Sequence, residues 1–146
     1  MYLSRSFTLE EMVRSEYATR KGIDNIPSQE VINNLRYLCV GCLQPLRDKL
    51  GKPIQITSGY RCPELNAAIG GSRTSQHMRG EAADIVVSGM TSKALFDYIV
   101  KCDIHFDQII EEFGAWVHIS FCAHEMRGHK LQARLEGGKT IYQVVV

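Results

Sequence analysis

Apolar residues in the first third of the chain recur with the spacing of one helix face. The apolar stripe comprises Val31, Ile32, Leu35, Leu38, Cys39, Cys42, Leu43 and Leu46. This i, i+3, i+4 pattern predicts an amphipathic helix that begins at Ser28, its N-cap, and runs to about Leu50. Gly51 follows as the stop signal, and Pro45 inside the run predicts a kink or a separate last turn.

Three further helices are shorter and are predicted mainly from their start signals. Thr8 and Glu11 form a capping box, which predicts a helix over residues 8–15. Pro63 after Cys62 suits the first turn of a second helix. The third is capped by Thr91 and runs to about residue 101.

Short apolar or alternating runs predict strands in the rest of the chain. They cover residues 54–58, 82–87, 108–113, 116–121, 131–135 and 140–145. Gly114 and Ala115 predict a tight two-residue turn between the third and fourth of these, and Gly137 with Gly138 predicts a hairpin between the last two. Because helices come first and antiparallel strands dominate the end, we predict an α+β fold with N-terminal helices packed on a mainly antiparallel sheet.

Composition narrows the class of protein without identifying it. The chain has 146 residues, of which 45% are hydrophobic and 23% charged, so we expect a single globular domain over residues 1–146. The formal net charge of +1 argues against a nucleic-acid partner. No apolar run approaches the ~18 residues of a membrane span.

Cys39 and Cys42 form a C-x-x-C pair inside the helical stripe. Their place in the stripe favours buried core residues over a metal or redox site.

Two predicted strands carry a polar residue where an apolar one is expected. Asp84 interrupts the apolar run of residues 82–87, and a buried carboxylate is costly unless it is paired, hydrogen-bonded or bound to a metal. His118 occupies a similar place in residues 116–121. Alternation puts His118 on one strand face with Trp116 and Ser120.

A second histidine precedes Asp84 by seven positions. His77 is separated from the strand by Gly80, which permits a sharp turn, so the two side chains can converge. His77, Asp84 and His118 together form a ligand set suited to zinc, with a fourth position left for water. Taken singly, a histidine in a strand is more often a satisfied core or surface residue, and a buried aspartate is more often a loop cap or an ion-pair partner.

The same residues carry a family resemblance. Ser75-x-His77-x-x-Gly80-x-Ala82-x-Asp84 matches the S-x-H-x-x-G-x-A-x-D signature of the zinc D-Ala-D-Ala carboxypeptidases and related peptidoglycan peptidases, which have the hedgehog/DD-peptidase fold. Residues 58–66 resemble the S-G-Y-R-x-P-x-x-N stretch before that signature, and residues 116–118 resemble the segment with the third ligand. The resemblance covers residues 53–121.

The resemblance implies roles for particular side chains. His77, Asp84 and His118 correspond to the zinc ligands. Arg61 corresponds to the family's substrate arginine, whose guanidinium suits a peptide carboxylate or the scissile carbonyl; its alternative is a surface pair with Glu64. Ser75 is expected to orient the substrate or the ligand loop. Trp116 is expected either to form a stacking wall for the substrate or to pack in the core.

The catalytic base departs from the family pattern. Many members have a glutamate three residues before the last histidine ligand, or a histidine two before it, where this chain has Ala115 and Trp116. A two-residue turn would place Glu111 on the face of His118, and a register shift would place Glu112 there. Related segments carry the acid at the position of Glu112, so we favour Glu112 over Glu111.

These observations predict a Zn²⁺ metallopeptidase that hydrolyses a bond at or near a D-amino acid in peptidoglycan stem peptides, of D,D-carboxypeptidase or endopeptidase type. The alternative is a non-catalytic zinc module that binds peptidoglycan or a partner. We expect a monomer. No signal peptide is visible at residues 1–10. We therefore expect a protein that is cytoplasmic as synthesised and reaches the cell wall after release or delivery, as phage-type enzymes do.

Overall fold

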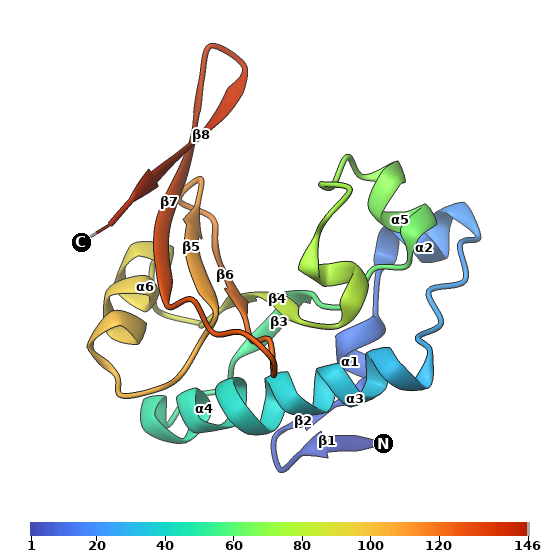
Figure 1. Cartoon of the computed structure of the whole chain (residues 1–146), viewed down its shortest axis with the longest axis horizontal. Coiled ribbons are helices and arrows are strands. Elements are labelled where there is room, and N and C mark those ends of the chain that lie inside the picture. Colours follow the sequence, from blue (N-terminus) through green and yellow to red (C-terminus); the bar gives the residue numbers. More distant parts are fainter. Residues whose placement is uncertain (146) are drawn as a thin grey trace.

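The computed structural model describes residues 1–145 and confirms an α+β fold in which helices flank a six-stranded sheet (Figure 1). The strand order is β3-β4-β6-β5-β7-β8. The bounds are β3 (Gln55–Ser58), β4 (Ala82–Val86), β5 (Gln108–Glu112), β6 (Trp116–Ser120), β7 (His129–Glu136) and β8 (Lys139–Val144). Neighbouring strands are antiparallel except β5 and β7, which are parallel. Val146, the last residue of the predicted domain, lies outside the described residues.

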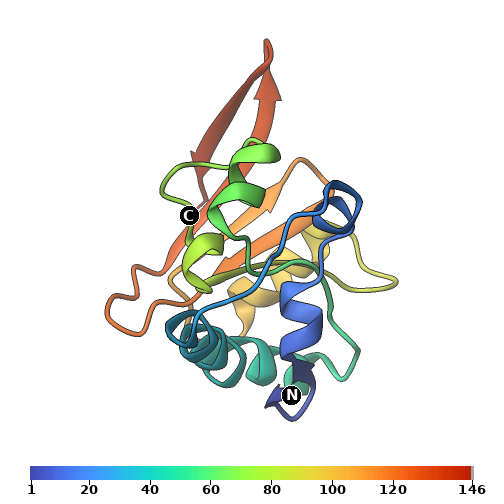
Figure 2. The ribbon, with the colours of Figure 1, turned by 90° about the vertical axis from the view of Figure 1, so that its right-hand side faces the viewer.

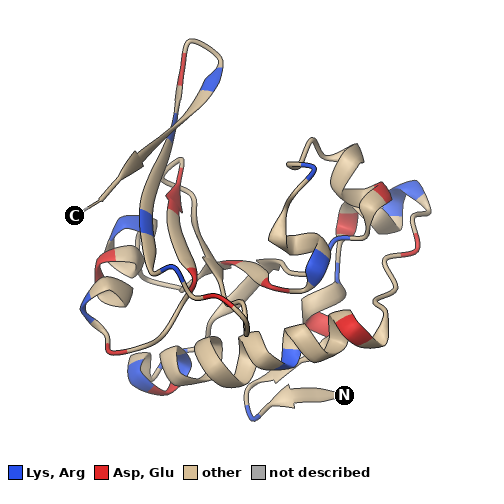
Figure 3. Cartoon of the chain, viewed as in Figure 1, with Lys and Arg blue, Asp and Glu red and all other residues tan. Residues whose placement is uncertain are grey.

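The helices are α1 (Leu9–Val13), α2 (Glu16–Lys21), α3 (Gln29–Leu38), η1 (Cys39–Leu43), α4 (Gln44–Leu50), α5 (Pro63–Ala68), η2 (Gln76–Arg79) and α6 (Ser92–Lys101). Two short strands, β1 (Tyr2–Ser4) and β2 (Phe7–Thr8), form a separate hairpin at the N-terminus. Within residues 1–145, no helix has the length and apolar character needed to cross a bilayer. Basic and acidic residues are interspersed along the ribbon, in keeping with the balanced net charge (Figure 3).

The predicted long helix forms, but it is divided by a π-helical turn. The proline ring of Pro45 would clash with the carbonyl of Gly41 in a regular α-helix. The chain avoids this conflict in η1, where the Gln44 N–H donates to the Cys39 carbonyl, five residues back. The predicted break at Pro45 therefore takes the form of a π segment followed by α4. The stripe is buried as predicted except for Ile32, which is half-buried. Burial raises the pKa of the Cys39 thiol to about 12, which fits a core residue.

The N-terminal region contains elements that the sequence pattern did not predict. The capping box at Thr8 and Glu11 is present, but α1 ends at Val13 rather than at residue 15. Ser15 instead begins α2, where its Oγ accepts a hydrogen bond from the Ala18 N–H. In the sequence, Ser15 as a helix cap is the signal that could have indicated α2. A six-residue helix is too short to show a periodic apolar stripe, so the pattern alone could not find it.

The turn between β5 and β6 differs from the prediction by one residue. The loop comprises Phe113, Gly114 and Ala115, because Glu112 pairs with Trp116 across the hairpin. Phe113 and Gly114 both adopt positive φ, +58° and +68°. The predicted two-residue turn is therefore wrong. In the actual register Ile110 lies opposite His118, so the side chain of Glu112, not that of Glu111, shares the His118 face of the sheet.

The C-terminal strands extend the sheet away from the rest of the molecule. β7 pairs with β5 by the parallel register, and β8 follows as the edge strand. Their hairpin projects beyond the helices (Figures 1 and 2). In register across the sheet, Glu112 lies beside Ala133 of β7, which lies beside Tyr142 of β8. The projecting hairpin thus continues the face that carries Glu112 and His118.

Candidate metal centre

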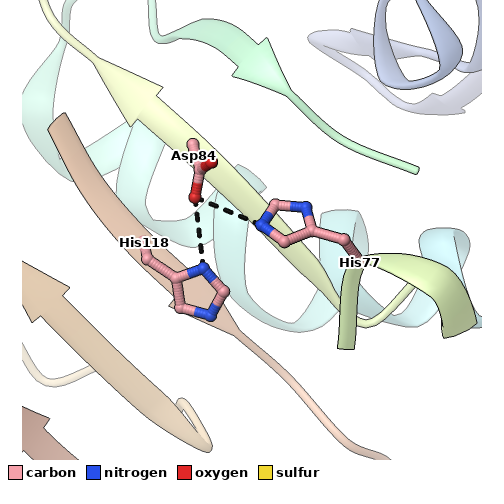
Figure 4. A group of neighbouring side chains, drawn as sticks. All are labelled: His77, Asp84 and His118. Carbon is pink, nitrogen blue, oxygen red and sulfur yellow. Dashed lines mark hydrogen bonds and ion pairs between the residues drawn. The ribbon is translucent and has the colours of Figure 1, made fainter. Parts of the chain in front are cut away.

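Three side chains from three different elements converge at the middle of the sheet. His77 comes from η2, Asp84 from β4 and His118 from β6 (Figure 4). Asp84 Oδ1 lies 3.3 Å from His77 Nε2 and 3.1 Å from His118 Nδ1. One ligand atom from each residue lies within 4.8 Å of the others, and all three residues are buried. The structure therefore brings the three predicted ligands together.

The spacing of these atoms fits a tetrahedral zinc ion. Zinc bonds to imidazole nitrogen and carboxylate oxygen are about 2.0–2.2 Å long, so neighbouring ligand atoms around a tetrahedral ion lie about 3.3 Å apart. The two contacts of Asp84 Oδ1 have that length. Two imidazoles and one carboxylate are also a donor set typical of catalytic zinc, which keeps one position open for water.

The orientation of His77 is held by its surroundings. Its Nδ1 lies 2.7 Å from the carbonyl oxygen of Gly59, and because a carbonyl only accepts, Nδ1–H must donate. Nε2 is then free to bind a metal, an arrangement common among metal-binding histidines. Ser75 caps η2, its Oγ accepting from the His77 N–H at 3.2 Å. Ser75 thus caps the segment that carries His77, a contact that one of its two predicted roles requires.

Gly80 ends η2 where the chain passes very close to α3. Its φ is +73°, and a Cβ at this position would lie 2.7 Å from the Val31 carbonyl oxygen and 3.1 Å from Leu35 Cγ. Only glycine combines this backbone conformation with this approach. Gly80 therefore lets the chain turn from η2 into β4, which places His77 beside Asp84.

Gly59 is equally constrained, by sterics alone. A Cβ there would lie 2.2 Å from the backbone oxygen of Met12 and would clash with it. We therefore expect Gly59→Ala to displace the Gly59 carbonyl from His77. We also expect this variant to have a free energy of unfolding lower by about 1–3 kcal/mol. Thermal denaturation and zinc titration would measure both effects. Gly89→Ala is the control: its Cβ would meet open space, so it adds backbone strain at φ +83° without weakening zinc binding. Unchanged zinc affinity in Gly59→Ala would contradict the expectation.

The charge of Asp84 is stabilised by its neighbours. Burial by itself would raise the pKa of this carboxyl, but the two imidazoles that face it hold the pKa well below its usual range. Its second oxygen, Oδ2, accepts from Arg61 Nη2 at 3.3 Å. Asp84 is therefore an ionised candidate ligand whose two oxygens contact different partners, one facing the histidines and one facing Arg61.

Arg61 lies beside the metal centre rather than on the surface. Its guanidinium also donates to Ser58 Oγ at 3.0 Å and to Asn66 Oδ1 at 3.3 Å. Among residues 1–145 it forms no ion pair with Glu64, so that alternative is wrong. Burial lowers the pKa of Arg61, opposed by the charges of Asp84 and Glu112. These contacts hold the guanidinium beside Asp84 at the wall of the cavity described below.

The two candidate bases lie on opposite faces of β5. Glu112 Oε1 is 3.8 Å from His118 Nδ1, whereas Glu111 accepts hydrogen bonds from Ser92 Oγ and the Gly114 N–H on the far face. Burial raises the pKa of Glu112, and the charge of Asp84 adds to this effect. Glu112 is thus the carboxylate that the hairpin register brings to the three ligands.

A cavity of about 890 Å³ opens over the metal centre. Trp116 forms part of its wall and packs edge-on against Phe113, with ring centroids 5.8 Å apart. The indole nitrogen of Trp116 is buried and, within the described residues, has no hydrogen-bond partner. Trp116 therefore lies at the site, paired with Glu112 across the β5–β6 hairpin.

Two residues of this cavity escaped sequence analysis. Tyr142 of β8 lines it, and burial together with the Glu112 charge raises the pKa of its phenol. Asp107 is 1% exposed and accepts hydrogen bonds from Arg127 and from Gln76, the residue before His77. Neither residue belongs to the signature, and only the strand pairing brings them near it. Both lie far from His77 in sequence, so spacing offered no signal.

Comparison with known proteins gives a match at the level of a family. A family model described as Peptidase M15 matches residues 5–120. The match spans the three ligands as well as Arg61 and Glu112, and it ends before β7 and β8. No curated protein matches the chain.

Proposed function

Because the chain belongs to the Peptidase M15 family, the family of zinc D-Ala-D-Ala carboxypeptidases, we propose that it hydrolyses a peptide bond at or near a D-amino acid in peptidoglycan stem peptides. Membership of this family supports the broader function of a zinc metallopeptidase that acts on peptidoglycan. The observation that carries the finer proposal is the position of Glu112, 3.8 Å from the ligand nitrogen of His118. A general base within reach of the metal favours a peptidase over a non-catalytic binding module.

His77, Asp84 and His118 would hold the zinc ion in this proposal. Zinc supplies a Lewis acid for the scissile carbonyl and lowers the pKa of a bound water toward ~7. Glu112 accepts a proton from the attacking water through a carboxylate oxygen. The water oxygen forms a bond to the carbonyl carbon, the C–N bond breaks, and Glu112 delivers the proton to the leaving amine.

Residues around the ligands would position the substrate. Arg61 is held by Ser58, Asn66 and Asp84, so its guanidinium loses little additional freedom when it binds a carbonyl or carboxylate oxygen of the peptide. The Trp116 side chain would exclude water from one wall of the cavity. Ser75 would act through the ligand segment, because it caps the helix that carries His77.

Mass spectrometry of purified muropeptides incubated with the protein tests this function. We expect a new product in the presence of zinc and its loss when a chelator is added, with recovery when zinc is restored. The product masses identify the bond that is cut. Intact muropeptides in the presence of stoichiometrically bound zinc would contradict the proposal and favour the binding module.

A further inference from the structure

A second cavity of about 650 Å³ lies beside the first, between α2, β3 and α5. Four residues line both cavities: Arg61, Ile69, Asp84 and Trp116. Because Asp84 is one of the three candidate ligands, the second cavity adjoins the candidate metal centre at this residue. A substrate bound across that centre therefore has space available on both sides, and the second volume lies within the range of about 300–1,000 Å³ typical of ligand sites.

Two of the three arginines that line the second cavity are exposed and carry charges that no acidic side chain of the described residues neutralises. Arg14 and Arg20 line it, and within residues 1–145 neither has a side-chain hydrogen bond or an ion pair. The Arg20 guanidinium lies over the ring of Tyr17, 5.9 Å from its centroid, and Tyr17 also lines the cavity. This contact favours a position of the guanidinium at the cavity wall. Glu16 also lines this cavity and is the acidic residue nearest to them in sequence. Figure 3 shows basic positions on α2 at the right of the view.

The arginines of the first cavity differ in this respect. Arg127 donates to both carboxylate oxygens of Asp107, at 2.8 and 2.7 Å. Arg79 pairs with Glu81 at 2.7 Å. These two guanidinium groups, like that of Arg61, are therefore engaged within the protein, whereas those of Arg14 and Arg20 are available to a ligand. A planar guanidinium binds a carboxylate with two parallel hydrogen bonds, a geometry that an uncharged amide does not reproduce.

We propose that the second cavity is a subsite for a carboxylate-bearing part of the substrate, with Arg20 and Arg14 as its anion-binding residues. This inference rests on the proposed function, since it takes the substrate to be a peptide held across the metal centre. Arg61 lines both cavities and so lies where the subsite adjoins the first cavity. The substrate then lies on both sides of the metal centre, with its free carboxylate directed toward α2.

Binding to two matched stem peptides tests the subsite. The peptides differ in one group only: the α-carboxylate of the D-glutamyl residue is free in one and an amide in the other. The zinc-loaded Glu112→Gln protein serves as the non-cleaving form, and calorimetry gives each Kd. We expect the free carboxylate to bind at least about tenfold more tightly than the amide, and this preference to fall to near unity in Arg20→Gln and to weaken in Arg14→Gln.

Lys21→Gln is the matched control. Lys21 neighbours Arg20 on α2 and lies 6.0 Å from the same Tyr17 ring, but it does not line the cavity, so the preference should persist in this variant. Equal binding of both peptides or binding of neither would overturn the inference. A loss of the preference in Lys21→Gln as large as that in Arg20→Gln would also overturn it. If zinc-dependent cleavage of muropeptides nevertheless occurs, the proposed function stands without the subsite. If Arg20-dependent preference is found without cleavage, the proposed function fails and carboxylate binding remains.

Discussion

Glu112→Gln is expected to lower the turnover of muropeptides by about 100- to 10,000-fold while leaving the zinc content unchanged. Glutamine keeps the size of the side chain but accepts no proton from water. Glu112 is not one of the three convergent ligands, so zinc remains bound. The rate of product formation, measured together with metal content of the purified variant, tests this expectation.

Glu111→Gln is the natural comparison because the two residues are adjacent in sequence. Glu111 bonds to Ser92 and to the Gly114 N–H on the face away from the metal centre. We expect its replacement to cost about 1 kcal/mol of stability and to leave turnover within a few-fold of the original. A large loss of activity in Glu111→Gln, with little change in Glu112→Gln, would mean that the hairpin register described above does not define the base.

His77→Ala is expected to remove both zinc and activity. Two ligands would remain, and zinc affinity should fall by more than about 100-fold, since even residues that only support a metal ligand contribute about 10- to 100-fold. His77 is 3% exposed, so the variant also leaves a space in the interior. Zinc titration and the muropeptide assay at saturating zinc measure the two losses separately.

A histidine elsewhere on the chain controls for a general effect of losing an imidazole. His105 is exposed and lies in the loop between α6 and β5, so His105→Ala should keep both zinc and turnover. Circular dichroism of both variants shows whether the fold persists. Full activity of folded His77→Ala would rule out the assigned metal centre.

Much of the fold follows from local signals in the chain. The apolar stripe of residues 31–46 has one face to bury, so a helix against a core is its favourable arrangement, and the structure contains it. Pro45 forbids a continuous α-helix there, and the break appears. By contrast, α2 was missed, because a short helix held by one cap and its tertiary contacts leaves little periodic pattern.

The sequence by itself determined which three residues are the candidate ligands. Asp84 and His118 interrupt apolar strands, and the signature spacing relates Asp84 to His77, so the sequence alone singles out these three residues. Their burial and their convergence agree with that choice. A polar residue inside an apolar strand can be recognised from the sequence, because the free-energy cost of burying it depends on the residue itself and on its immediate neighbours in the chain.

Only the tertiary structure decided which carboxylate faces the metal centre and what surrounds it. One additional residue in the turn at Phe113 exchanges the faces of Glu111 and Glu112, since side chains alternate along a strand. Tyr142 and the second cavity likewise depend on strand pairing and helix packing between segments distant in sequence. Turn conformation and long-range packing are set by the energy of the whole fold, and no local pattern encodes them.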